Sequence, residues 1–184
     1  DANPDLKDAR TVLRQLYVER GDVLGAVNLI EHQLQRTEGP SARGSLYAEL
    51  GTLQAKKLDQ LDQAKSAWRT ALDLDPTISE AAQGLADLLF EEGDFAAAAK
   101  LYEPLLARTS SMPVDEAKQL ALRCGDSFKA IGEHVKAQRA YLNAKAFAAE
   151  DRGVLERLAE VTFESGAPDE AAELYSQLLE KFGK

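Results

Sequence analysis

The chain has 184 residues, of which 45% are hydrophobic and 29% are charged, as in ordinary folded proteins. Its formal net charge of −9 argues against nucleic acid and anionic membranes as partners, because both require a basic protein face. No apolar run approaches the ~18 residues of a membrane-spanning helix, so no direct membrane insertion is expected. The single cysteine, Cys124, excludes an internal disulfide framework.

Helical segments separated by short turns follow one another along the whole chain. In the stretch 71–102, one helix ends before Pro76, which cannot continue it, and the next opens at Ser79. After Gly93-Asp94 another helix starts at Phe95. The same interpretation predicts an all-α chain of ten helices, at 6–20, 23–36, 41–57, 61–74, 79–92, 95–108, 114–131, 134–147, 151–165 and 168–182. Pro40 and Pro113 are expected in the first turns of helices, and Pro104 is expected to kink one.

Three residue types recur in or just before the second helix of each helix pair. A small residue that lets paired helices approach closely stands at Ala26, Ala64, Ala98, Ala137 and Ala171. Four residues later, on the same helical face, a bulky core residue stands at Ile30, Trp68, Tyr102, Tyr141 and Tyr175. Five residues before four of the alanines a glycine permits a left-handed turn, at Gly21, Gly93, Gly132 and Gly166. The second unit carries Leu58-Asp59-Gln60 at this turn instead.

The alanines are 38, 34, 39 and 34 residues apart, and this pattern resembles the tetratricopeptide repeat. The resemblance covers nearly the whole chain. It implies a single array over 1–184, an α-solenoid wound as a right-handed superhelix of five helix-turn-helix units, at about 7–43, 44–78, 79–117, 118–151 and 152–184. Both ends resemble interrupted repeats, so we expect a fragment of a longer bacterial protein. Leu174, Leu178 and Phe182 are expected to be partly exposed.

Sites for chemistry are not expected in this sequence. Gly39-Pro40-Ser41-Ala42-Arg43-Gly44-Ser45 faintly resembles a phosphate-binding loop, but it lacks the lysine and the preceding strand. Cys124 stands where the other units have a core leucine, which indicates packing and not a nucleophile. His32 and His134 have no partners at metal-ligand spacing. We therefore expect no catalytic residue, no cofactor and no metal, and the chain is not expected to be an enzyme.

The resemblance implies that the first helices of the units line a concave groove that binds extended or helical peptide segments. Helical phase selects the residues that would face this groove, which we call the first-helix row. They are Thr11, Gln15, Val18, Glu19, Ala48, Glu49, Thr52, Ala55, Lys56, Gln83, Asp87, Phe90, Glu91, Leu122, Arg123, Asp126, Lys129, Glu156, Arg157, Glu160, Phe163 and Glu164. Eight are acidic and four are basic, so a net negative groove is predicted.

This charge separates two behaviours of the family. Members that dock chaperone tails resemble one another in a basic carboxylate clamp, and the corresponding positions here carry Thr11, Gln15, Glu49, Glu80 and Gly84. Capture of an acidic tail is therefore not expected, and a peptide with basic and apolar residues is favoured.

Phe90 and Phe163 lie at phases that core aromatics do not need. They are either apolar anchors for a ligand, flanked by Asp87 and Glu160, or they pack against a neighbouring turn or the final helix.

A protein–protein interaction scaffold is the function that we favour from the sequence, because no catalytic site is visible. The alternatives are a regulatory or substrate-recognition region of a larger enzyme and a self-assembling module that forms homo-oligomers through its ends. The cysteine content leaves the compartment open, with the cytoplasm favoured over the periplasm.

Overall fold

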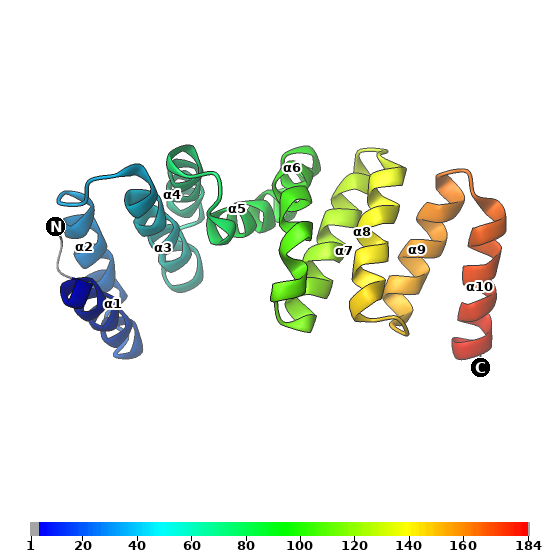
Figure 1. Cartoon of the computed structure of the whole chain (residues 1–184), viewed down its shortest axis with the longest axis horizontal. Coiled ribbons are helices and arrows are strands. Elements are labelled where there is room, and N and C mark those ends of the chain that lie inside the picture. Colours follow the sequence, from blue (N-terminus) through cyan, green and yellow to red (C-terminus); the bar gives the residue numbers. More distant parts are fainter. Residues whose placement is uncertain (1–3, 184) are drawn as a thin grey trace. The chain divides into compact units, whose positions relative to one another are not determined.

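The computed structural model describes residues 4–183, which form helices and turns (Figure 1). The elements are α1 (Pro4–Glu19), α2 (Val23–Leu34), α3 (Pro40–Leu58), α4 (Leu61–Leu74), α5 (Ser79–Glu91), α6 (Phe95–Leu105), the 3-10 helix η1 (Leu106–Ser111), α7 (Val114–Ala130), α8 (His134–Phe147), α9 (Arg152–Glu164) and α10 (Pro168–Phe182). No described residue lies in a β-strand, and no bound of the ten predicted helices differs by more than three residues. The all-α prediction is confirmed.

The helices form two compact units, residues 1–85 and residues 86–184, with the boundary inside α5. In the first unit α1 pairs with α2 and α3 with α4, and α2 also contacts α3. In the second unit α7 pairs with α8 and α9 with α10, while α6 contacts α7 and α8 contacts α9 (Figure 1). Within each unit, a hairpin thus packs on its sequence neighbour, as in a repeat array. The division into five repeats stays a prediction.

The turns between paired helices use the left-handed backbone region. Gly21, Gly93, Gly132 and Gly166 have φ of 79°, 82°, 78° and 90°, which confirms their predicted role. In the second hairpin Asp59 takes the same conformation with φ of 54°, and among the described residues it is the non-glycine residue with positive φ. An aspartate therefore supplies the left-handed residue here, because Asp tolerates this region better than most residues.

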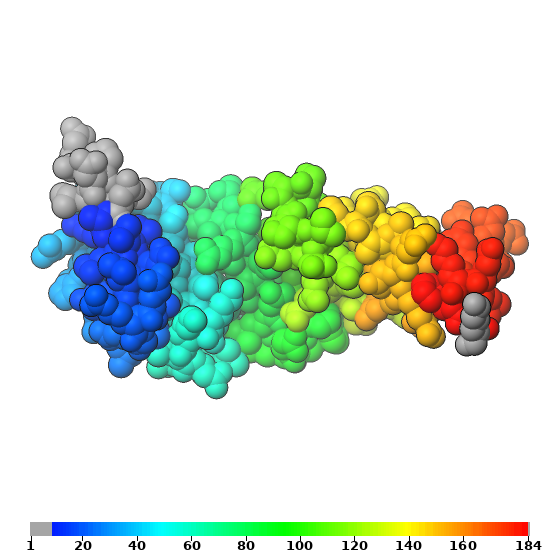
Figure 2. All heavy atoms as spheres, turned by 90° about the horizontal axis from the view of Figure 1, so that it is seen from below, coloured from blue at the N-terminus to red at the C-terminus, as the bar shows by residue number. Residues whose placement is uncertain are grey.

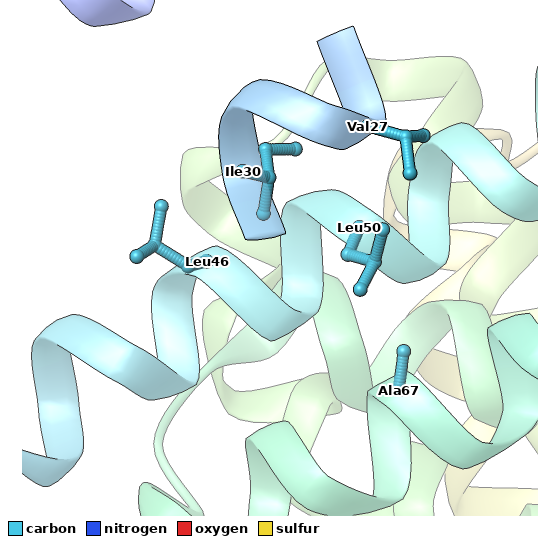
Figure 3. Packing of buried hydrophobic residues seen from close by; sticks show 5 residues of the cluster. All are labelled: Val27, Ile30, Leu46, Leu50 and Ala67. Carbon is cyan, nitrogen blue, oxygen red and sulfur yellow. The ribbon is translucent and has the colours of Figure 1, made fainter. Parts of the chain in front are cut away.

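The core of residues 1–85 joins three helices. Val27 and Ile30 of α2 pack with Leu46 and Leu50 of α3 and with Ala67 of α4 (Figure 3). Their side chains leave water almost completely, and apolar burial of this kind contributes about 25 cal/mol per Å² to folding. The bulky position of α2 therefore helps to hold the following hairpin.

An equivalent cluster holds the hairpins of residues 86–184 together. Ala121 of α7, Ala144 of α8 and Val154 of α9 are fully buried, and Leu106 and Ala148 pack against them at partial burial. Small residues at this junction bring α8 close to α9.

The predicted core positions are buried with two exceptions. The five recurring alanines and Cys124 are buried, as are the bulky residues of the first four helix pairs, Ile30, Trp68, Tyr102 and Tyr141. Tyr175 is 43% exposed, so its assignment to the core is wrong. The chain supplies no described helix after α10 to cover this ring. Leu13, at the core-leucine position of the first helix pair, is 42% exposed, so its assignment is wrong as well. The predicted partial exposure of Leu174, Leu178 and Phe182 is confirmed.

Prolines mark the limits of several helices. Pro40 and Pro168 occupy the first turns of α3 and α10, where a missing N–H costs nothing. Pro113 instead lies just before its helix, as the N-cap of α7. Pro104 removes an interior hydrogen bond, and α6 ends one residue later, where the chain tightens into η1.

Candidate partner-binding surface

In residues 1–85 a buried arginine bonds to residues of the first-helix row. Arg14 of α1 is 5% exposed and donates to Glu49 Oε1 of α3 at 2.7 Å, to Gln33 Oε1 at 2.7 Å and to Thr11 Oγ1 at 3.2 Å. Charge-assisted bonds of this kind are short and strong. Glu49 is therefore committed to joining two helices. Helical phase could have identified Arg14, because it places this arginine on the buried side of α1, but the sequence analysis did not name it.

Other row residues of this unit also bond within the chain. Thr52 of α3 donates to Glu80 Oε1 of α5 at 2.8 Å. Gln15 donates to Glu19 Oε1 at 2.9 Å on the exposed surface of α1. These contacts bring the first helices α1, α3 and the start of α5 together along one row.

Residues 86–184 carry a polar link that we call the first clasp, formed by Asp87, Tyr102 and Arg123. Tyr102 Oη donates to Asp87 Oδ1 at 2.5 Å, and Arg123 Nη1 donates to the same oxygen at 3.1 Å. Tyr102 lies on α6 and Arg123 lies on α7 of the following hairpin, so Asp87 connects two successive hairpins. Arg123 Nη2 also lies 2.9 Å from Glu91 Oε1.

Phe90 lies beside the first clasp and contacts its arginine. The guanidinium of Arg123 lies 5.3 Å from the centre of the Phe90 ring, within the range of a cation–π contact. On another side the ring meets Phe95 edge to face, with centroids 5.4 Å apart. Phe90 is partly buried between these groups.

The second clasp repeats this arrangement one hairpin later with Asp126, Tyr141 and Arg157. Tyr141 Oη donates to Asp126 Oδ1 at 2.7 Å, and Arg157 Nε of α9 donates to the same oxygen at 3.0 Å. Arg157 also donates to the carbonyl oxygen of Gly153 at 3.2 Å. The aspartate stands 15 residues before its tyrosine in both clasps, so the device follows the repeat.

The clasp tyrosines are buried acids beside carboxylates. Burial raises the pKa of Tyr102, and its hydrogen bond to Asp87 raises it further. Burial likewise raises the pKa of Tyr141, followed by its bond to Asp126. Both phenols therefore remain protonated donors at neutral pH.

A third cluster joins α7, α8 and α9. Lys129 Nζ lies 2.6 Å from Glu160 Oε2 and 3.8 Å from Glu164 Oε1. His134 Nδ1 of α8 lies 3.2 Å from the other oxygen of Glu164. His134 is partly buried here and faces a carboxylate, whereas His32 is exposed.

Phe163 contrasts with Phe90, because its ring is 63% exposed on α9. One turn before it lies Glu160, whose side chain is 54% exposed, and Glu164 follows it directly. A turn earlier Glu156 accepts from Arg152 Nε at 2.7 Å in an exposed pair. The exposed face of α9 thus presents one aromatic ring among carboxylates.

The basic side chains of the row in residues 86–184 are held by acids. Arg123, Lys129 and Arg157 each lie within an ion pair to a row carboxylate. Acids outnumber bases in this part of the row, so negative charge remains after the pairs are formed. The structure places the predicted residues of α5, α7 and α9 side by side through these contacts.

The described residues include no group of three or more His, Cys, Asp or Glu side chains placed to hold a metal ion. Among residues 4–183, no helix is both long enough and apolar enough to cross a bilayer. Cys124 lies in the core of α7, where burial raises its pKa to about 12, so little thiolate exists at neutral pH.

Comparisons with known proteins show the fold through solved structures. No protein-family profile and no curated protein matches the sequence. A crystal structure of MamA matches at a TM-score of 0.68 with 20% identity, over 95% of this chain and 90% of that chain. MamA from Desulfovibrio magneticus RS-1 matches at 0.65 with 16% identity, over 94% of this chain and 93% of that chain.

A second kind of structure has the same fold. TPR-like repeats of a putative kinesin light chain from Podosopora anserina match at a TM-score of 0.60 with 17% identity, over 97% of this chain and 95% of that chain. Identities this low concern the fold alone. The chain therefore has the all-helical hairpin fold of TPR-like repeat proteins, as its sequence pattern indicated.

Proposed function

We propose that the chain is a protein-binding scaffold and that the first-helix row of residues 86–184 binds a segment with basic and apolar side chains. The observation that carries this proposal is Phe163, a large ring that is 63% exposed beside Glu160 and Glu164. An exposed aromatic among polar groups is the usual composition of a binding hot spot.

The charge of the row supports a basic partner. Lys129 is shared between Glu160 and Glu164, so one positive charge faces two carboxylates there. Arg123 is likewise shared between Asp87 and Glu91, whose side chains are partly exposed. Lysine or arginine side chains of a partner would supply the missing positive charge and would accelerate association by electrostatic attraction.

The chain itself contains a precedent for the contact that we propose at Phe163. In the first clasp Arg123 stacks over Phe90 while bonding to Asp87 and Glu91. Phe163 has carboxylates at similar helical offsets but keeps its ring open to solvent. A partner arginine could therefore stack on Phe163 and pair with Glu160, and a neighbouring apolar side chain would cover the ring edge.

Binding without chemistry is part of the proposal. The one thiol, Cys124, is buried with a raised pKa. The clasp tyrosines are protonated donors held in structural bonds, which leaves them no role as a base.

Labelled peptides of defined composition test this proposal by fluorescence anisotropy. One peptide alternates arginine with leucine, and the second, of equal length, alternates glutamate with leucine. We expect the basic peptide to bind, more weakly as salt is added, and the acidic peptide not to bind. Phe163→Ala and Glu160→Lys should each weaken binding about tenfold, which corresponds to a hot-spot loss near 1.4 kcal/mol.

Val135→Ala provides the matched control, because Val135 is an exposed apolar residue of α8 outside the row. It should leave the affinity unchanged. Equal binding of both peptides, or an unchanged affinity after Phe163→Ala, would contradict the proposal.

A further inference from the structure

The contact between α8 and α9 includes a group that changes its charge near neutral pH. His134 is the first residue of α8, and its Nδ1 lies 3.2 Å from Oε2 of Glu164 on α9. Figure 2 shows α8 in yellow beside α9 in orange. Histidine gains or loses its proton between about pH 5 and pH 8, so this contact exists in two charge states.

The geometry makes the contact between His134 and Glu164 depend on that charge. Nδ1 is shielded from water and makes no aligned hydrogen bond among the described residues. A neutral imidazole therefore gains little from the carboxylate. A protonated imidazole attracts it, and because the two side chains are 35% and 32% exposed, water screens this attraction only in part.

Glu164 belongs at the same time to the carboxylates that we assign to the partner. Its other oxygen, Oε1, lies 3.8 Å from Lys129 Nζ of α7, which also lies 2.6 Å from Oε2 of Glu160. With a neutral imidazole, this cluster carries one positive charge and two negative charges. A proton on His134 adds the second positive charge, so it removes the excess negative charge from this part of the row.

The other charged groups near His134 do not replace its partner on α9. Glu133 precedes it as the N-cap residue of α8 and is exposed to water. Lys136 follows it, but its Nζ lies 3.6 Å from Glu103 Oε2 and 5.1 Å from the centre of the Phe128 ring. The N-terminus of a helix disfavours a positive charge, so an imidazolium at the start of α8 depends on the carboxylate of α9.

We propose that His134 is a pH-dependent switch for the binding of a basic segment. At low pH the protonated imidazole holds Glu164 against α8 and neutralises the cluster. At higher pH the neutral imidazole releases this carboxylate, which then pairs with a cation of the partner. The affinity therefore falls as the pH falls. This switch rests on the proposed function, because it controls the same carboxylates.

The test uses the arginine–leucine peptide with both ends blocked, in fluorescence anisotropy at about pH 5.5 and about pH 8 and at constant ionic strength. Arginine keeps its charge throughout this range, so a pH dependence belongs to the protein. The unmodified chain should bind about threefold to fivefold more weakly at the lower pH, the effect of one partly exposed charge. His32→Gln is the matched control and should keep this dependence, because His32 is exposed on α2, outside the row.

Two substitutions at His134 fix the opposite states of the switch. His134→Gln removes the titrating group, so its affinity should stay near the higher value at both pH values. His134→Lys carries a permanent positive charge, so its affinity should stay near the lower value. The melting temperature of each variant is first compared with that of the unmodified chain at each pH.

The outcomes separate the switch from the binding that it controls. Equal affinity of the unmodified chain at both pH values would overturn the switch and leave the proposed function intact. A pH dependence that persists at full size in His134→Gln would also overturn it, because other groups would then be titrating. A peptide that binds at neither pH would overturn the proposed function together with the switch.

Discussion

The two units stabilise the bulky core residue of the repeat in different ways. In residues 1–85 Trp68 is 4% exposed, and a Cβ atom added to Gly51 or Gly84 would overlap its indole ring. Its Nε1 finds no hydrogen-bond partner among the described residues. In residues 86–184 Tyr102 and Tyr141 are equally buried, but each hydroxyl is bonded to an aspartate that an arginine also holds.

This difference shows that the bulky position of the repeat can be held by volume or by polar links. Trp68 fills space that two glycines leave, and its stability depends on close packing. The tyrosines fill less space, and their clasps bring in an arginine from the following hairpin. At this position the second unit therefore depends on bonds between hairpins, whereas the first depends on close packing around one ring.

Removal of the indole ring should have the largest effect. Trp68→Ala should lower the free energy of unfolding by roughly 3–5 kcal/mol, because it leaves a cavity and forfeits apolar burial. Urea denaturation followed by far-UV circular dichroism measures this change. Trp68→Phe, which keeps an aromatic ring, should cost clearly less, and an unchanged midpoint for Trp68→Ala would contradict the packing description.

Filling the space beside the ring should have the next largest effect. Gly84→Ala places a methyl group against the indole and should cost about 1–3 kcal/mol through overpacking. The cost should disappear in the Trp68→Ala background, because the clash partner is then missing. Gly153, where an added Cβ has more room, gives the matched control for the intrinsic effect of Gly→Ala in a helix. A clash cost that persists without Trp68 would show that another contact limits Gly84.

The sequence predicts which residues of a hairpin are buried better than it predicts the contacts between hairpins. Helical phase places Trp68, Tyr102 and Tyr141 in the core, because that assignment needs only the 3.6-residue period. The clasps join residues 36 and 31 positions apart, and they depend on how hairpins stack, which no local pattern states.

Tyr175 also shows that local sequence does not determine how helices pack on one another. It satisfies the repeat pattern fully, yet its burial requires a covering helix that local sequence does not supply. Among the candidate binding residues, phase cannot distinguish the engaged Phe90 from the exposed Phe163.

The second clasp can be dissected by a double-mutant cycle. Asp126→Ala should cost about 2 kcal/mol, because it removes the acceptor of two bonds and leaves Tyr141 buried without its partner. Arg157→Ala should cost less, since its side chain is partly exposed. The double variant should cost less than the sum of the two. Additive costs would mean that Asp126 and Arg157 do not act together.

Alkaline pH should weaken residues 86–184 selectively. The pKa values of Tyr102 and Tyr141 are raised above the ordinary value of 10.0, chiefly by burial. Their stabilising effect is therefore complete below pH 10 and is lost as pH rises above it, because only the unfolded chain releases these protons. The loss approaches about 1.4 kcal/mol per pH unit for each tyrosine. Cys124 acts in the same direction between pH 9 and about 12.

Trp68 is the only tryptophan, so its fluorescence reports residues 1–85 while circular dichroism reports the whole chain. Between pH 9 and pH 11 the denaturation midpoint measured by circular dichroism should fall, and Tyr102→Phe combined with Tyr141→Phe should flatten this dependence. A pH dependence that is unchanged in the double variant would assign it to other groups.

The smallest expected effect concerns the turn in which the first unit departs from the glycine pattern. Asp59→Gly should stabilise the chain by about 0.5 kcal/mol, because glycine relieves the strain at φ of 54° while adding disorder to the unfolded state. The reverse change, Gly93→Asp, should destabilise by a similar amount at φ of 82°. Thermal melts of the two variants should therefore move in opposite directions. If Asp59→Gly instead lowers the melting temperature, the aspartate contributes more to this turn than its backbone conformation, and the two units differ in their turns as well as in their cores.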